Sequence, residues 1–261
     1  MRFIVGILLL LALAAKAEEQ VIWKLDEANA KVDGRKEWYM GNPPPVVEPA
    51  EGGGFVLKST AAHDMTLHPG AWLVFDLTEA KTVEQHKYTA WSIHCHKEKY
   101  GYIVGSGHNV PLGLYTIKIS DLDKPLTAGV IFYNYNLHMK FKYVKMVNEP
   151  DNSLCAIVPE GKKTLEVGDK ITIVLKLKEP CEDVSCKLFQ DRFPFSINGT
   201  DAVELKAMDD DCKIWQADIT IKSYKSKRAV GMRGIRIKAS VLGGKLDTPI
   251  YGVIPAAFKQ Q

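Results

Sequence analysis

The stretch from Gly113 to Val147, GLYTIKISDLDKPLTAGVIFYNYNLHMKFKYVKMV, decides the fold. Apolar and polar residues alternate along three segments of it, which is the period of a β-strand with one buried and one wet face. Turn residues at 121–125 separate the first two segments, and 136–138 predict a tight reversal before the third. Successive strands without a helical period favour an antiparallel sandwich. Tyr115, Ile117 and Ile119 form the first apolar row, and Val130 and Phe132 lead into an odd-numbered row of Tyr133, Tyr135, Leu137, Met139, Phe141 and Tyr143.

Segments with the same two-residue period lie on both sides of this stretch. Short strand-like segments separated by Gly and Pro are typical of sandwiches and jelly rolls, and no long amphipathic helix interrupts them. The sequence therefore predicts an all-β protein. The segments before the stretch are 21–25, 36–40, 55–59, 71–77, 87–96 and 100–104, and those after it are 170–177, 215–222 and 235–241.

The first 17 residues have the features of a secretory signal peptide. Arg2 precedes an apolar run from Phe3 to Ala15, and Ala15-Lys16-Ala17 fits a small-x-small cleavage site. The run is shorter than the roughly 20 residues that span a bilayer, and no later stretch is more apolar, so we expect no membrane span. We therefore expect a secreted or periplasmic protein after cleavage near Ala17.

The charge of the expected mature chain is nearly balanced. The sequence has 34 Lys and Arg against 31 Asp and Glu, and removal of Arg2 and Lys16 leaves 32 basic residues. A surface this balanced offers no electrostatic footprint for nucleic acid or for an acidic membrane.

A polar, Pro-containing run at 148–153 separates two blocks of strands. Such runs are typical of boundaries between domains. The sequence therefore predicts a first domain over 18–147, a linker over 148–153 and a second domain over 154–261, after the signal peptide at 1–17.

Each block resembles a known family of β-sandwiches. The first resembles the galactose-binding-like jelly rolls, the fold of many carbohydrate-binding modules, through 21–25, 71–77, 113–117 and 141–147. The second resembles the immunoglobulin-like domains of secreted bacterial proteins, through 166–169, 215–217, 242–244 and 248–250. These resemblances imply a glycan-recognition or surface-scaffold role. They carry no binding residue across, because such jelly rolls place their ligand contacts on variable loops and faces.

The cysteines are candidates for disulfides, because export leads to an oxidising compartment. Cys181 and Cys186 bracket a short acidic loop and could close it, and Cys155 with Cys212 would then join the first segment of the second domain to a later strand. Four cysteines allow three pairings, and the sequence does not choose among them. We expect Cys95, without a partner in its half, to be a small buried hydrophobe.

His94 and His96 form the most specific polar pair in the chain. Residues two apart on a strand share a face, which suits a shared metal ion, and His63, Asp64 or His68 could supply a third ligand. Without a placed third ligand, a polar strand face that lines a groove explains the pair better. Alternation also points Cys95 away from both histidines, which argues against a Cys–His nucleophile.

Three aromatic residues beside turns are candidates for stacking on sugar rings: Trp38, Tyr39 and Tyr100. Sugar sites combine such rings with polar groups that hydrogen-bond to hydroxyls. No nucleophile elbow, metalloprotease motif or phosphate-binding glycine loop is present, so no catalytic residue is predicted. Asp209-Asp210-Asp211 suits a solvated loop or a loose structural calcium site, and Asn198-Gly199-Thr200 is a turn or, in a eukaryotic host, a glycosylation acceptor.

The residues thus predict a secreted, non-catalytic binding protein. We expect the first domain to recognise a carbohydrate or another cell-surface ligand, with Trp38, Tyr39, Tyr100, His94 and His96 as candidate contacts. One alternative is a structural or assembly module of the cell surface. The other is a metal-dependent enzyme that uses His94 and His96.

Overall fold

The computed structural model describes residues 19–25, 38–39, 47–59, 61–83, 90–96, 103–107, 111–119, 122–190, 193–225 and 235–259. Within these ranges every regular element is a β-strand, which confirms the all-β prediction. None of them holds a helix that could cross a membrane. The predicted signal peptide and Tyr100 lie outside the described residues.

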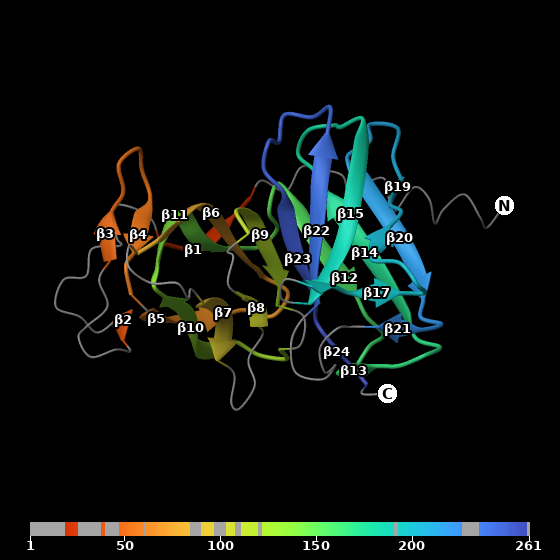
Figure 1. Cartoon of the computed structure of the whole chain (residues 1–261), viewed down its shortest axis with the longest axis horizontal. Coiled ribbons are helices and arrows are strands. Elements are labelled where there is room, and N and C mark those ends of the chain that lie inside the picture. The colour runs from red at the N-terminus through yellow and green to blue at the C-terminus, as the bar shows by residue number, and fades with distance from the viewer. Residues whose placement is uncertain are drawn as a thin grey trace.

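The N-terminal half contributes the strands β1 to β11 (Figure 1). They are β1 (Val21–Leu25), β2 (Trp38–Tyr39), β3 (Val47–Pro49), β4 (Phe55–Leu57), β5 (Ala61–Leu67), β6 (Trp72–Thr82), β7 (Ala90–His96), β8 (Ile103–Gly107), β9 (Gly113–Lys118), β10 (Leu126–Tyr135) and β11 (Leu137–Val147).

The C-terminal half contributes β12 to β24. They are β12 (Ser153–Ile157), β13 (Thr164–Leu165), β14 (Lys170–Lys176), β15 (Asp183–Gln190), β16 (Phe193–Pro194), β17 (Ser196–Ile197), β18 (Ala202–Val203), β19 (Lys206–Ala207), β20 (Ile214–Thr220), β21 (Tyr224–Lys225), β22 (Ile235–Leu242), β23 (Ile250–Ile254) and β24 (Ala257–Phe258).

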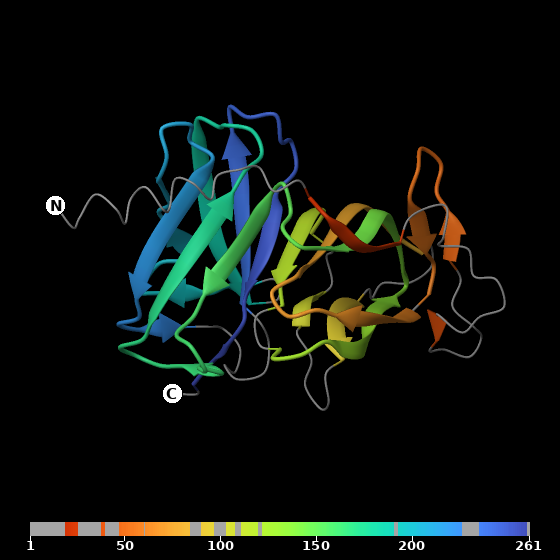
Figure 2. The same cartoon turned by 180° about the vertical axis from the view of Figure 1, so that it is seen from behind.

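One large sheet, which we call the shared sheet, runs through both halves. Its order is β16-β15-β22-β23-β9-β6-β11-β4-β3, with β1 beside β11 and β18 beside β15. A five-stranded sheet, β2-β5-β10-β7-β8, forms a second layer in the N-terminal half, and a four-stranded sheet, β12-β14-β20-β19, does so in the C-terminal half. Figure 2 shows the layers of each half from behind. Two short pairs, β13-β24 and β17-β21, complete the fold.

The stretch from Gly113 to Val147 forms three strands as predicted, but not a hairpin at its end. β10 pairs with β5 and β7, whereas β11 pairs with β1, β4 and β6. Only Asn136, with a left-handed φ of 55°, separates these two strands. The predicted reversal at 136–138 is therefore wrong, because the chain passes from one sheet to the other at this residue.

Alternation along β11 places its apolar residues in the core of the N-terminal half. Leu137, Met139 and Phe141 are buried. A register irregularity between Phe141 and Tyr143 then shifts the phase of the strand, so that Val144 is buried and Tyr143 only half-buried. The bulge explains why the odd-numbered apolar row ends early.

The core of the C-terminal half follows the predicted pattern along two strands. Alternate residues of β14 are buried from Ile171 to Leu175, and those of β22 are buried from Ile235 to Ala239. The pattern weakens along β20, where Trp215 is buried but Ala217 and Ile219 are only half-buried.

A seam between β9 and β23 joins the two halves. The strands pair in parallel, with Leu114 opposite Ile250 and Tyr115 opposite Tyr251. The fully buried Thr116 hydroxyl accepts a hydrogen bond from the Leu154 amide at 2.9 Å and lies 3.1 Å and 3.3 Å from the carbonyl oxygens of Leu154 and Tyr251. One side chain thus links strands from both sides of the predicted boundary.

The residues predicted as a linker are held by polar contacts. The carboxylate of Asp151 pairs with Lys178 at 2.7 Å, and Glu149 pairs with Lys176. Asn152 accepts a hydrogen bond from the backbone amide of Lys178 at 2.9 Å. These residues therefore pack onto the C-terminal half, and the shared sheet joins the halves beside them. The division into a jelly roll and an immunoglobulin-like domain stays a prediction.

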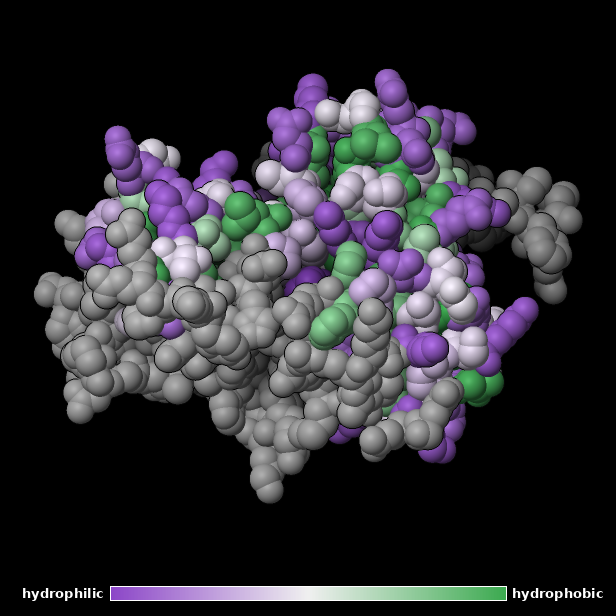
Figure 3. Space-filling model, in the orientation of Figure 1, coloured by the Kyte–Doolittle hydropathy of each residue, from purple (hydrophilic) through white to green (hydrophobic). Residues whose placement is uncertain are grey.

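Polar residues cover most of the coloured surface in Figure 3, with small and scattered apolar areas. The most exposed large apolar side chains in the described ranges are Met208, Val167 and Ile157, at 58%, 55% and 54%. They come from separate segments, and single exposed apolar residues are normal on a protein surface.

Candidate ligand-binding site

The two faces of the five-stranded sheet can be identified from the last residues of β5. Thr66 is exposed, whereas the next residue, Leu67, is only 1% exposed. Successive positions on a strand belong to opposite faces, and directly paired positions on neighbouring strands belong to the same face. The strand register therefore assigns the other positions of the sheet either to the face of Thr66, which we call the outer face, or to the face of Leu67.

His94 and His96 of β7 occupy positions on the outer face. His94 pairs with Ile131 of β10, which pairs with Ala62 of β5, and His96 is connected in the same way through Gly129 to Asp64. Because positions 62 and 64 have the same parity as Thr66, the register assigns positions 94 and 96 to the outer face.

The two candidates on β2 divide between the faces. Tyr39 pairs with Ala62 and belongs to the outer face, whereas Trp38 pairs with His63 and belongs to the face of Leu67. Tyr133 of β10 pairs with Ser92 of β7, which adds a tyrosine position to the outer face. The sequence placed Tyr133 in the apolar row of the stretch, because only the pairing shows which row of β10 belongs to which face.

The register also separates the residues considered as a third metal ligand. Asp64 lies in the same row as His96, with Gly129 between them, while His63 belongs to the opposite face. Cys95 pairs with Val130 and shares that opposite face, as the sequence predicted. In the described part of the chain, no three His, Cys, Asp or Glu side chains form a metal-binding group.

The seam contains buried polar aromatic groups whose contacts are structural. Tyr115 stacks between Phe75 and Tyr251, each with a centroid distance of 4.6 Å, and its hydroxyl donates a hydrogen bond to the carbonyl of Pro111 at 2.7 Å. Burial raises the pKa of Tyr115, so the phenol stays neutral. The Arg236 guanidinium lies 5.7 Å from the Tyr251 ring centre, a cation–π distance.

A groove of about 430 Å³ opens in the C-terminal half beside β20. The half-buried Ala217 and Ile219 line it, which explains why burial weakens along this strand. Charged groups at Glu204, Asp218 and Lys222 also line the groove. The sequence carried no signal for it, because its walls come from strands of three different sheets.

The Asn-Gly turn at the edge of this groove is structural. Asn198 and Gly199 have φ values of 55° and 88° and connect Ile197 to Thr200, as in a type I′ turn. The Asn198 side chain donates to the carbonyl of Thr220 at 2.9 Å and accepts from the amide of Lys222 at 2.7 Å. The left-handed φ values and the backbone hydrogen bonds between Ile197 and Thr200 confirm the prediction of a turn.

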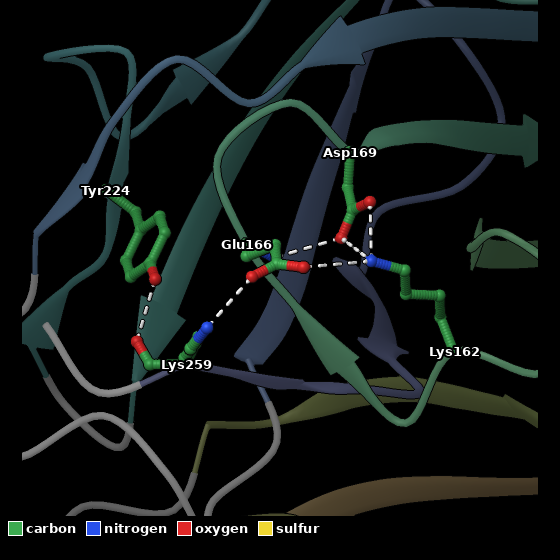
Figure 4. Close-up of polar contacts among 5 residues, drawn as sticks. All are labelled: Lys162, Glu166, Asp169, Tyr224 and Lys259. Carbon is green, nitrogen blue, oxygen red and sulfur yellow. Dashed lines mark hydrogen bonds and ion pairs between the residues drawn. The ribbon is translucent and has the colours of Figure 1, made fainter.

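An ion-pair cluster, which we call the terminal latch, holds β24 against the loop before β14 (Figure 4). Lys162 pairs with Asp169 at 2.9 Å and with Glu166 at 3.4 Å, and Glu166 also binds Lys259 at 3.1 Å. The Tyr224 hydroxyl donates to the carbonyl of Lys259 at 2.7 Å. The hydrogen bond from Lys259 lowers the pKa of Glu166 most. With each ionic group paired within the latch, it serves structure rather than chemistry.

The predicted disulfides are absent, because Cys155, Cys181, Cys186 and Cys212 are free thiols. Cys186 faces the core from the middle of β15 and is buried, which raises its pKa to about 12. Cys181 precedes that strand and its thiol faces Cys212 instead, with the sulfur 3.9 Å from the Cys212 carbonyl oxygen. Both predicted pairs, Cys181–Cys186 and Cys155–Cys212, are therefore wrong for this state of the protein.

The Asp209-Asp210-Asp211 run forms a turn whose first carboxylate caps the backbone. One Asp209 oxygen accepts from the amides of Lys213 and Ile214, both at 2.9 Å, and Asp211 pairs with Lys213 at 3.4 Å. These contacts match the solvated-loop interpretation and occupy an oxygen that calcium would need.

Comparisons with known proteins leave the family open. No family model and no curated protein matches the chain. Among solved structures, the chain is similar to a DUF4785 family protein from Legionella pneumophila, with 10% identity and a TM-score of 0.26 over 91% of this chain and 70% of that one. A likeness this weak carries no argument about function.

Proposed function

We propose that this is a non-catalytic binding protein that recognises a carbohydrate of a cell surface through the outer face of the five-stranded sheet. One observation carries the proposal. The strand register collects Tyr39, Tyr133, Asp64, His94 and His96 on the face that includes the exposed Thr66.

This combination of residue types suits sugar recognition. Tyrosine rings offer apolar surfaces on which the faces of sugar rings stack, and carboxylate and imidazole groups form hydrogen bonds with hydroxyls. Neighbouring strands lie about 4.8 Å apart, so positions on adjacent strands form a row along which an extended polymer could bind. The opposite face, with Leu67, supports the sheet from the core side.

Binding to an array of plant, algal and host polysaccharides tests the proposal, with the mature chain as the probe. We expect binding to at least one polysaccharide, and an affinity at least about tenfold lower for Tyr39→Ala and Tyr133→Ala, because aromatic anchors dominate such sites. Phe193→Ala is the matched control, since Phe193 lies on β16 in the C-terminal half. Absence of binding across the array would favour a structural or assembly module of the cell surface.

A metal-dependent enzyme is the second candidate, favoured by the shared row of Asp64 and His96 beside His94. Two strand spacings separate Asp64 from His96, about 9.6 Å between backbones, and Gly129 adds no side chain between them. Two histidines and one carboxylate are common metal ligands. Stoichiometric metal in the purified protein that is lost in His94→Ala with His96→Ala supports this candidate, and metal-free protein removes it.

A further inference from the structure

We propose that Cys181 and Cys212 form a reversible disulfide that fastens two loops at one end of the C-terminal half. Cys181 lies in the loop between β14 and β15, and Cys212 lies between β19 and β20. The Cys181 thiol donates a weak hydrogen bond to the Cys212 carbonyl at 3.9 Å, across a separation of 31 residues. The fold thus brings together a pair that is distant in the sequence.

Backbone hydrogen bonds hold Cys212 in place beside Cys181. The Cys212 amide donates to the Asp209 carbonyl at 3.2 Å, and the Trp215 indole donates to the Cys212 carbonyl at 2.9 Å. Cys212 has a φ of 53°, a left-handed conformation that is unfavourable for a residue with a side chain. Such strain is a common property of functional positions.

The Cys181 thiol lies beside the backbone of Cys212, so a disulfide requires the Cys212 side chain to turn toward it. Within Cys212, the Cα–C and C=O bonds place the carbonyl oxygen at most about 2.75 Å from Cα. The Cys181 sulfur therefore lies within about 6.7 Å of the Cys212 Cα, since it is 3.9 Å from that oxygen. Rotation of the Cys212 side chain and a shift of its surface turn would bring the sulfurs to bonding distance.

Gly244 restricts Cys181 on another side. A Cβ atom at Gly244 would lie 3.2 Å from the Cys181 Cβ and 3.0 Å from a Val241 methyl group, so this third loop packs closely on the cysteine. Contact with two neighbouring loops orients the thiol before any oxidation, which favours the bond with Cys212 over bonds that need a larger movement.

Oxidation would proceed by thiol–disulfide exchange with a low-molecular-weight disulfide such as oxidised glutathione. The half-buried Cys212 thiolate attacks the oxidant and releases one glutathione thiol, leaving a mixed disulfide. The Cys181 thiolate then attacks the Cys212 sulfur and releases the second glutathione thiol. The protein loses two hydrogens in total, and both appear on the two glutathione molecules.

The test equilibrates the full chain in buffers of graded glutathione ratio, traps free thiols by alkylation, and maps peptides without reduction. We expect a linked peptide that joins Cys181 to Cys212 and a melting temperature about 5–10 °C higher than in dithiothreitol, because the bond closes a long loop of the unfolded chain. Cys212→Ala, at the half-buried position, should abolish both effects. Cys155→Ala is the matched control and should keep both.

Two results would overturn the proposal. One is a linked peptide in native protein that joins Cys181 or Cys212 to another cysteine. The other is complete alkylation of both thiols at every glutathione ratio in protein whose circular dichroism shows the native β-sheet signal. If Cys155→Ala fails to fold, Cys186→Ala provides the same control.

Discussion

The shared sheet and the five-stranded sheet of the N-terminal half use polar residues in different ways. In the shared sheet, Thr116 is fully buried and bonds to the backbone of the other half. In the five-stranded sheet, the register brings Tyr39, His94 and His96 to the face of the exposed Thr66. The comparison teaches that hydrogen bonds explain a polar residue on a strand when the residue is buried in the core. A polar residue at a position on an exposed strand face is instead a candidate for function.

The largest expected effect comes from closing the space between β23 and β12, beside the seam. A Cβ at Gly252 would lie 2.1 Å from the carbonyl oxygen of Leu154, so Gly252→Ala must separate β23 from β12. We expect a loss of about 3 kcal/mol or more in the free energy of unfolding, measured by urea denaturation. Gly52→Ala is the comparison, because no atom lies within 4 Å of its Cβ position and its φ of 78° adds only backbone strain, so we expect a smaller loss. Equal stability of the two variants would mean that the close approach of β23 to β12 does not contribute to the stability of the C-terminal half.

A smaller effect is expected from removing one buried hydroxyl. Thr116→Val keeps the shape of the side chain but leaves the Leu154 amide without its acceptor, at a cost of about 1–3 kcal/mol. Thr172→Val is the matched control, because the Thr172 hydroxyl bonds to Asp218 at an exposed site, where the cost should stay below about 1 kcal/mol. Thermal denaturation of both variants measures the difference, and a reversed order would contradict the role given to Thr116.

On the outer face, substitutions should leave the free energy of unfolding nearly unchanged. We expect His94→Ala to change it by no more than about 0.5 kcal/mol while weakening polysaccharide binding, since surface substitutions away from the core are usually neutral. Urea denaturation and binding to the same polysaccharide measure the two quantities. A large loss of stability would show that His94 belongs to the core and would weaken the assignment of the faces.

The smallest effect is expected at the terminal latch. Hydrogen bonds from Lys259 to Glu166 and from Lys162 to Asp169 lower the pKa of both carboxyls. Their ion pairs should therefore contribute fully above the ordinary Glu pKa of 4.5 and be lost as the pH falls through the lower folded-state values. Salt should weaken them, because they are exposed.

Hydrogen exchange of the Lys259 amide, which donates to the Leu165 carbonyl at 2.8 Å, measures this effect. Glu166→Gln should speed its exchange modestly at neutral pH, and Glu160→Gln, at an exposed site outside the latch, should not. Unchanged exchange in Glu166→Gln would show that the backbone pairing alone holds β24.

The sequence predicted strands better than their partners. Alternation identified β14 and β22, because each buries one row of apolar residues, from Ile171 to Leu175 and from Ile235 to Ala239. It did not reveal the pairing of β9 with β23, since a strand pattern reports which face is buried and not which strand lies alongside. The shared sheet could therefore not be derived from the predicted boundary at 148–153.

For the candidate site, the sequence supplied residues and the register supplied their arrangement. His94 and His96 were identified from spacing alone, and the pairing adds Tyr39 and Asp64 to the same face. The spacing of the cysteines, in contrast, predicted pairs that the structure does not contain. Spacing suggested Cys181 with Cys186, but alternation along β15 turns Cys186 into the core and away from the loop that holds Cys212.

Amide hydrogen exchange of the mature protein, followed by mass spectrometry with and without the polysaccharide that it binds best, tests the outer face most directly. The account predicts slower exchange in peptides that cover β5, β7 and β10, and no change in peptides that cover β14 and β20. Protection confined to the C-terminal half, or exchange that no polysaccharide alters, would contradict it.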